Sequence, residues 1–534
     1  MTSDPHGTAP ATGRDDIATA SLDDDADVAD VERDVRRALD SRDWARAVRL
    51  VGAHWSALLD EPGQLLDEAL RLIPLDAFEL DARAAAVRDI RLHSSADAVD
   101  RMLGSAALPD ADDLDELEAL ARSDRALSLL SVAASRMIAL RVRGRFPRAI
   151  RLASLVERFS RIAAVHRPGL VASRVPAALL QAGITRGLAD DLAGAVLSLR
   201  DAYERSGDSR VDYVQRDAAG KAALFLALDG DIEQASAWVA RHDAAPDVEG
   251  WFSSRIALTA DTARAIIGIE SLRRDDAEAA LRMLDQPVNA EQGWGPAVTY
   301  ARARHALVWG DRLGTLQSVR DDKMRFESWL GEGSTLGPLL THAEVELLLS
   351  LRQDAQAQRA AADHADHHIA RLTRARLALA AGDAPLAARR AVEALGASRT
   401  TRERLGALAT HAAARAARPV EGEYSDLAAS VRERGLLSTW LAVPAAARSA
   451  LGADLADTQG AREVAALDDD RVRITPQQRR VLEGLDRGMS LQAIASGSHL
   501  SINTVKSHAR ALYQRLGVAT RDEAVAAAYD LGLL

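Results

Sequence analysis

A short pattern returns eight times along this chain, and it constrains the fold more than any other feature. Each copy consists of the apolar end of one helix, a turn containing Gly or Asp, and a second helix that opens with Ala at fixed places. The copies lie at 39–48, 141–150, 185–196, 226–235, 271–280, 307–316, 351–360 and 377–387. Neighbouring copies in the second half are roughly 30–45 residues apart, a spacing typical of two-helix repeats stacked in a solenoid.

The rest of the sequence also favours helices. From about residue 28 onward, apolar residues recur every three or four positions. Hydrophobic residues make up 48% of the chain but aromatic residues only 4%, and Ala and Leu, which dominate the apolar content, are strong helix formers. We therefore predict an all-α chain in which a long helical-repeat region precedes a small C-terminal module. An irregular all-helical domain is the alternative for the long region.

The Gly-Asp turns of the long region resemble those of tetratricopeptide-like repeats, although the usual Trp and Tyr positions are not consistently filled. The resemblance implies an extended concave surface for a peptide, a protein or a small effector. A passive spacer is the alternative. Trp251-Phe252 and Trp294-Gly295 could line an effector pocket, but scattered Trp side chains more often fill the core of a solenoid.

Several classes of enzyme are excluded by missing residues. The chain has no cysteine, which removes disulfides, cysteine-bound zinc, iron–sulfur clusters and thiol nucleophiles. Only Gly220-Lys221 could belong to a phosphate-binding loop, but Gln215 replaces its first Gly and Ala222 replaces the Ser or Thr after its Lys. We also find no Gly-x-Ser-x-Gly motif. We therefore predict no enzymatic activity and no cofactor.

One histidine pair has the spacing of a zinc site. On a helix, His364 and His368 would lie one turn apart, with Asp363 nearby, and two such imidazoles can bind zinc. However, Ala365 stands where a metalloprotease motif has Glu, and no third ligand is identifiable. We interpret the pair as part of a solvated helix face and predict no metal site.

Charge divides the chain into parts. The whole chain carries a formal charge of −11 and residues 471–534 carry +4, so the preceding part carries −15. We predict an acidic disordered tail over 1–27, a helical sensing or interaction region over 28–452, a linker over 453–470 and a basic module over 471–534. A basic module on an acidic body indicates nucleic acid as the partner of the module. No signal peptide and no membrane span are apparent, so we expect a cytoplasmic protein.

Cap residues divide the basic module into four short helices. A capping box marks the first and the fourth helix, because Gln or Glu follows the cap residue at the third position. The second and third helices are separated by a tight turn, which makes them a helix-turn-helix. The expected caps are Thr475 with Gln478, Ser490, Ser501, and Thr520 with Glu523.

The third helix, Ile502 to about Leu516, is the expected recognition helix, because such helices enter the major groove and read bases near their N-terminus. Its apolar residues define an inward stripe of Val505, Ala509, Leu512 and Leu516. The outward face is then Asn503, Lys506, Ser507, Arg510 and Gln514. Arg510 can bind guanine O6 and N7 bidentately. Ser501 and Thr504 lie where the N-terminus of the helix would meet a phosphate.

These motifs strongly resemble the LuxR-type DNA-binding domain over about 62 residues. The resemblance is carried by 474–482, 488–490, 494–495, 500–508, 516–518 and 521–525, and above all by the Thr-Val-Lys-x-His sequence of 504–508. It implies that the third helix reads the major groove and that the fourth helix joins two copies on a two-fold site. We assign base contacts to Lys506, Ser507, Arg510 and Asn503, and contacts to the DNA backbone to Ser490, Ser501, Thr504 and His508.

The module also departs from that family at three positions. Gln478, Ser498 and Ala511 stand where Glu, Leu and Asn are usual. Of the three, Ser498 should reduce the stability of the module most, because losing a buried Leu can cost a few kcal/mol.

The whole chain resembles the large LuxR-type regulators of the MalT-like group, whose DNA-binding module follows tetratricopeptide-like repeats. Members often carry an N-terminal nucleotide-binding domain, whose motif we do not find here. We predict a DNA-binding transcriptional regulator that binds double-stranded DNA as a homodimer and takes an unidentified effector or protein partner on its repeats. The alternative is a helical scaffold with a degenerate DNA-binding module.

Overall fold

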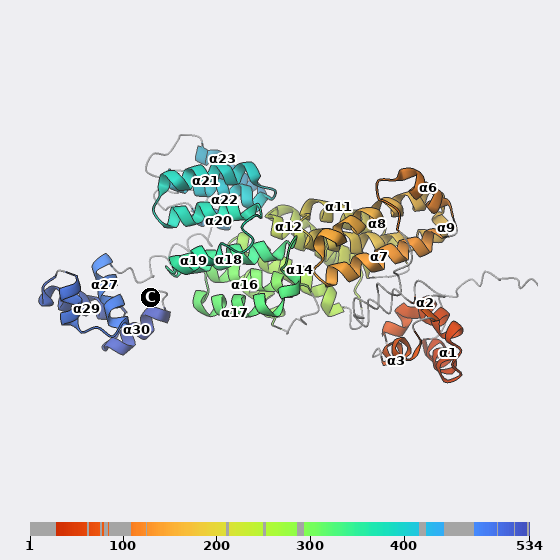
Figure 1. The fold of residues 1–534 in the computed structure, drawn as a ribbon, viewed down its shortest axis with the longest axis horizontal. Helices are drawn as coiled ribbons and strands as arrows, with labels where there is room; N and C mark the ends of the chain where they lie inside the picture. The colour runs from red at the N-terminus through yellow and green to blue at the C-terminus, as the bar shows by residue number, and fades with distance from the viewer. Residues whose placement is uncertain are drawn as a thin grey trace, which may run out of the picture. The chain divides into compact units, whose positions relative to one another are not determined.

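The computed structural model (Figure 1) is helical throughout the part of the chain that it describes. The predicted tail (1–27) and linker (453–470) lie outside the described residues. The chain divides into two compact units, 1–84 and 85–534. The described residues are 28–60, 64–74, 77–78, 84, 108–123, 125–209, 213–248, 253–285, 293–415, 423–442, 475–498, 500–516, 518–530 and 533–534.

The first unit contains three described helices: α1 (Val28–Asp40), α2 (Trp44–Asp60) and α3 (Gln64–Leu72). They pack through small and branched apolar side chains that are completely buried, among them Val35, Val48 and Leu66. The expected turn at 39–48 joins α1 to α2.

The second unit begins with a long series of helices, most of which pack against the next one in the chain. In chain order they are α6 (Leu114–Arg122), α7 (Ala126–Val142), α8 (Phe146–His166), α9 (Pro168–Val171), α10 (Val175–Leu188), α11 (Leu192–Glu204), η2 (Ser206–Asp208), α12 (Val214–Asp229), α13 (Ile232–Ala244), α14 (Ser253–Glu270), α15 (Arg274–Met283), α16 (Gly295–Val308), α17 (Arg312–Arg325), η3 (Glu327–Trp329), α18 (Leu336–Ser350), α19 (Asp354–Ala360), α20 (Ile369–Ala380), α21 (Ala384–Ala397), α22 (Thr401–Ala414), α23 (Glu423–Arg434) and η4 (Leu437–Ala442).

All eight copies of the repeated pattern lie at junctions between two helices, as predicted. Seven of these turns contain a residue in the left-handed region, with φ between 55° and 98°. An aspartate one residue later often caps the next helix, as Asp231 does by accepting a hydrogen bond from Gln234 N (3.2 Å). The left-handed residues are Arg42, Gly144, Asp190, Gly230, Leu272, Arg352 and Gly382. In seven of the eight copies the pattern therefore corresponds to the same backbone conformation.

The Trp294-Gly295 pair takes part in core packing. The ring of Trp294 lies 6.1 Å from that of Phe225, centroid to centroid. Gly295 is buried, and the ring of Phe326 occupies the place where its Cβ would be. The other aromatic pair, Trp251-Phe252, lies outside the described residues.

Contacts between distant repeats tie the end of this region to its middle. Thr335 donates a hydrogen bond from its hydroxyl to Gly187 O (2.5 Å). Arg402, at the start of α22, donates to Ala227 O (2.7 Å) at the end of α12. It also pairs with the fully buried Glu270 at the end of α14 (2.5 Å). A simple stack of repeats makes contacts only between neighbours, so these links depart from that arrangement.

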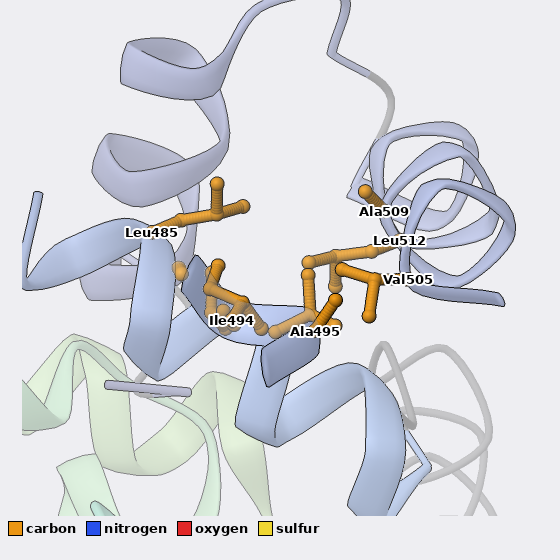
Figure 2. Close-up of a cluster of buried hydrophobic side chains, with 9 residues drawn as sticks. Leu485, Ile494, Ala495, Val505, Ala509 and Leu512 are labelled. Atoms are coloured by element: carbon orange, nitrogen blue, oxygen red, sulfur yellow. The ribbon is translucent and has the colours of Figure 1, made fainter. Parts of the chain in front are cut away.

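The last four helices enclose a separate apolar core. They are α27 (Pro476–Asp486), α28 (Leu491–Gly497), α29 (Ile502–Leu516) and α30 (Arg521–Asp530). Figure 2 shows side chains from α27, α28 and α29 meeting in this core. Its buried members are Val481, Leu482, Leu485, Ile494, Ala495, Val505, Ala509, Leu512 and Ala528. In the described part of the chain, none of the helices has the length and apolarity that crossing a membrane would require.

Candidate nucleic-acid interface

The predicted caps fix the positions of the helices in the C-terminal module. Thr475 and Gln478 form both hydrogen bonds of a capping box, from Gln478 N to Thr475 Oγ1 (3.2 Å) and from Thr475 N to Gln478 Oε1 (2.8 Å). Ser490 caps α28 by accepting from Ala493 N (3.2 Å). Such bonds satisfy backbone amides that have no partner inside the helix.

The fourth helix begins at a second capping box, formed by Thr520 and Glu523. Glu523 N donates to the hydroxyl of Thr520 (3.3 Å), and the Glu523 carboxylate accepts from Thr520 N (3.0 Å). The same carboxylate also accepts a hydrogen bond from Ala519 N (3.0 Å). Hydrogen bonds from the backbone of Ala519 and Thr520 lower the pKa of Glu523, because they stabilise its charged form.

The buried face of α29 holds the helix on the module. Val505, Ala509 and Leu512 are at most 3% exposed, and Leu516 packs against the same core while partly exposed. Figure 2 shows the three fully buried side chains entering the core from one side of α29. The predicted inward stripe is therefore confirmed.

The opposite face of α29 carries the polar side chains. Because these positions are three or four residues apart, they line one side of the helix. The exposed members are Asn503, Lys506, Ser507, Arg510 and Gln514. Of the residues assigned to the DNA backbone, Ser490 and Ser501 are exposed, whereas Thr504 and His508 are half-buried.

The start of α29 has a compact hydroxyl pair. Ser501 caps the helix by accepting from Thr504 N (3.1 Å), and the two hydroxyl oxygens lie 2.7 Å apart. This end of the helix carries free backbone amides and the positive end of its dipole, which together attract an anion.

The charge around α28 and α29 has one sign. No acidic residue occurs in the sequence between Asp486 and Asp522, whereas that segment contains Arg487, Lys506 and Arg510. The basic residues of this segment attract a polyanion.

Ser498 lies at the end of α28, beside the core of the module. It is half-buried, ends α28, and donates its backbone amide to Ile494 O (3.0 Å). Leu500, Ile502 and Met489 pack against the buried cluster.

The histidine segment differs from the prediction. We expected His364 and His368 on one helix face, but α19 ends at Ala360, α20 begins at Ile369, and the residues between them form turns. His364 has φ +54°, which a continuous helix does not allow. Instead, His367 and His368 meet Asp190, a residue distant in sequence. No local pattern identifies Asp190, because 178 positions separate it from His368.

The four helices, their caps and the exposed basic face together define a helix-turn-helix module. Residues 473–528, which contain α27, α28, α29 and most of α30, match the family model described as "Bacterial regulatory proteins, luxR family". This part of the chain is thus a LuxR-family regulatory domain, and such a domain implies DNA binding and transcriptional regulation. No curated protein matches the chain.

Proposed function

We propose that this chain is a DNA-binding transcriptional regulator that reads a major-groove site through α29. The observation that carries the proposal is the contrast between the two faces of this helix. One face is locked into a buried core, and the other presents Asn503, Lys506, Ser507 and Arg510 to solvent. A recognition helix needs both properties, since it must be rigid and also reach base edges.

The exposed residues divide into two roles. Lys506 and Arg510 are one turn apart, and both side chains suit the acceptors of guanine. Asn503 suits adenine, and Ser507 can contact any base edge. Ser490, Ser501, Thr504 and His508 hold the DNA backbone, the first two from the N-termini of α28 and α29. Backbone contacts fix the register of a protein on DNA but carry no sequence information.

For the other regions of the chain, we propose the roles that the sequence predicts. The region 28–452, built of tetratricopeptide-like repeats, receives an effector or protein partner, and 453–470 links it to the module at 471–534. The module acts in the cytoplasm as a homodimer paired through α30. Two copies related by a two-fold axis require two inverted half-sites on the DNA.

The competing function is a helical scaffold whose C-terminal module has decayed. The buried cluster of the module supports the regulator, because its apolar side chains hold α29 in the position of a recognition helix. The two functions also differ in salt dependence. Each phosphate neutralised by the regulator adds to a steep fall of affinity with salt, which a scaffold without DNA binding does not show.

The test is selection of bound sites from random DNA by the full chain, followed by affinity measurements on the selected site. We expect inverted half-sites. Lys506→Ala and Arg510→Ala should each remove about 1–3 kcal/mol of discrimination at one base position. Thr504→Ala should weaken binding to all sequences by similar factors.

Arg480→Ala is the control for loss of a positive charge. Arg480 is exposed on α27, outside the proposed reading face, and its loss should leave base preference unchanged. An Arg510→Ala chain that selects the same bases as the unmodified chain would refute the assignment of this residue. Failure of the full chain to select any site would favour the scaffold.

A further inference from the structure

Three metal-ligating side chains converge where the turn between α10 and α11 meets the start of α20. Asp190 Oδ1 lies 3.0 Å from His367 Nε2 and 3.2 Å from His368 Nε2. One ligand atom from each of the three residues lies within 4.8 Å of the other two. The cluster is therefore assembled by folding and not by local spacing.

The separations suit a small metal ion. Zinc binds imidazole nitrogen and carboxylate oxygen at about 2.0–2.2 Å, so two ligand atoms of a tetrahedral site lie about 3.3 Å apart. Both measured nitrogen–oxygen distances are close to this value. The side chains are 8–20% exposed, so the cluster is sheltered but accessible to an entering ion.

The second nitrogen of His368 lies beside a carboxylate, where a metal-bound imidazole usually has its outer partner, although it makes no hydrogen bond in this arrangement. Its Nδ1 lies 2.7 Å from Glu403 Oε1, on α22. Metal-binding histidines commonly donate their other N–H to a carboxylate, which fixes the tautomer and turns the free lone pair toward the metal. In this orientation, Nε2 of His368 faces Asp190.

The other histidine also has a suitable nitrogen. Nε2 of His367 is buried and makes no hydrogen bond, although it lies close to Asp190. Its Nδ1 accepts one long bond from Ile369 N (3.3 Å). Binding a metal at Nε2 places the proton on Nδ1 and costs only this bond.

We propose that Asp190, His367 and His368 bind one first-row divalent cation of the zinc type, with Glu403 as the positioning residue behind His368. Two imidazoles and a carboxylate suit zinc and its neighbours in the first transition row, whereas magnesium prefers an all-oxygen shell. Asp190 and Glu403 supply two negative charges to the ion, and the exposed Arg399, whose Nη1 lies 3.5 Å from Asp190 Oδ2, supplies one positive charge nearby. A water molecule completes the coordination.

The site joins parts of the chain that are far apart. Asp190 occupies a left-handed turn after α10, and the histidines precede α20. A bound ion therefore fastens the later helices onto the earlier ones. Because the ligands come together only in the folded chain, the ion should stabilise the fold. This inference does not depend on DNA binding.

The competing explanation needs no metal. Burial lowers the pKa of His368, but Asp190 and Glu403 outweigh this effect and raise it to about 9. In this explanation a protonated His368 lies between the carboxylates of Asp190 and Glu403, and its charge takes the place of a metal ion. The two explanations differ in whether the chain takes up zinc, so the experiment decides between them.

The experiment uses the full chain without an affinity tag, stripped of metal with a chelator. Zinc is titrated in competition with a chromophoric chelator, and we expect one ion per chain and a higher melting temperature. Cobalt(II) should bind at the same stoichiometry with the strong visible absorption of a four-coordinate ion, and magnesium should not bind. Absence of stoichiometric zinc binding would overturn the proposal in favour of the imidazolium.

Substitutions locate the site. Asp190→Asn preserves a side chain that tolerates φ +63° but removes the charge. We expect this change and His367→Asn to abolish the zinc-induced rise in melting temperature. Glu403→Gln should weaken zinc binding by about 10–100-fold, the usual effect of losing an outer partner.

His364→Asn is the matched control, because His364 lies in the same segment, also at positive φ, but outside the cluster. It should bind zinc like the unmodified chain. Circular dichroism in chelator checks that each variant is folded. Equal zinc affinity in Asp190→Asn, His367→Asn and the unmodified chain would refute the site, as would loss of binding in His364→Asn alone.

Discussion

At the residue scale, Ser501 combines a structural and a proposed binding role in one hydroxyl. The hydroxyl accepts a hydrogen bond from Thr504 N and so begins α29. The same end of the helix is the proposed contact with a phosphate. Substitutions can separate the two roles, because Asp is as good a cap as Ser but carries a negative charge.

Ser501→Ala should destabilise the module by about 1 kcal/mol through loss of the cap. Ser501→Asp should retain the stability of the module and weaken DNA binding on every sequence, because its carboxylate repels the phosphate. Unfolding curves and binding isotherms of the two variants measure these effects. Thr475→Asp, which places the same charge at the exposed cap of α27, is the control. Equal losses of affinity in Ser501→Asp and Thr475→Asp would contradict the phosphate contact.

At the scale of elements, the repeated turn shows how one backbone conformation serves different surroundings. Gly230 and Gly382 occupy equivalent places in two turns, with φ +98° and +79°. A Cβ on Gly382 would meet nothing within 4 Å, whereas a Cβ on Gly230 would lie 2.9 Å from Arg402 N. Gly382 is therefore required by the backbone conformation alone, whereas Gly230 is required also by its contact with α22.

Substitution by alanine should therefore distinguish these two turns. Gly382→Ala should cost about 1–2 kcal/mol, the price of a left-handed residue with a side chain. Gly230→Ala should cost clearly more, because the start of α22 must also move. Urea unfolding of the full chain measures both free energies. Equal costs would mean that the contact between Gly230 and Arg402 adds nothing to stability.

The elements also show which features a sequence can predict. Caps such as Thr475 and Ser490, and turns such as that at Gly230, were predicted correctly because each depends on residues within a few positions. The helical spacing of His364 and His368 was wrong, because periodicity alone does not reveal that α20 starts only at Ile369. The partnership of His367 with Asp190 depends on packing between distant helices, which no local pattern encodes. The roles assigned to the α29 side chains stay predictions.

At the scale of the second unit, the buried carboxylate of Glu270 connects segments distant in sequence. It pairs with Arg304 (3.1 Å) and Arg402 (2.5 Å) and accepts a hydrogen bond from the hydroxyl of Ser438. Burial raises the pKa of Glu270, but the two guanidinium groups and the hydroxyl outweigh it and lower the pKa to about 2. In the unfolded chain this carboxyl titrates near 4.5.

Stability should consequently fall in acid. Glu270 has a lower pKa in the folded state than in the unfolded chain, so its ionised form stabilises the fold. Its contribution to the free energy of unfolding is complete above about pH 5 and is lost as the pH falls toward 2. The difference between the two pKa values corresponds to about 3 kcal/mol of unfolding free energy. Urea unfolding of the metal-free full chain between pH 7 and pH 3 measures the fall.

Glu270→Gln removes this titration. The variant should be less stable at pH 7, since the buried Arg402 and the half-buried Arg304 lose this counter-charge. Its disadvantage relative to the unmodified chain should shrink as the pH falls. A difference in unfolding free energy that stays constant from pH 7 to pH 3 would contradict the pKa of Glu270.

The links from Glu270 to its later partners also set an order of events during synthesis. Ser438 follows Glu270 by 168 residues. At about 5–20 residues per second, a ribosome takes roughly 10–30 s to cover that distance. For most of this interval the carboxylate of Glu270 can meet Arg304, which follows it by 34 residues, but neither Arg402 nor Ser438 has been synthesised. The complete set of partners of Glu270 therefore forms only after the last of them has been made.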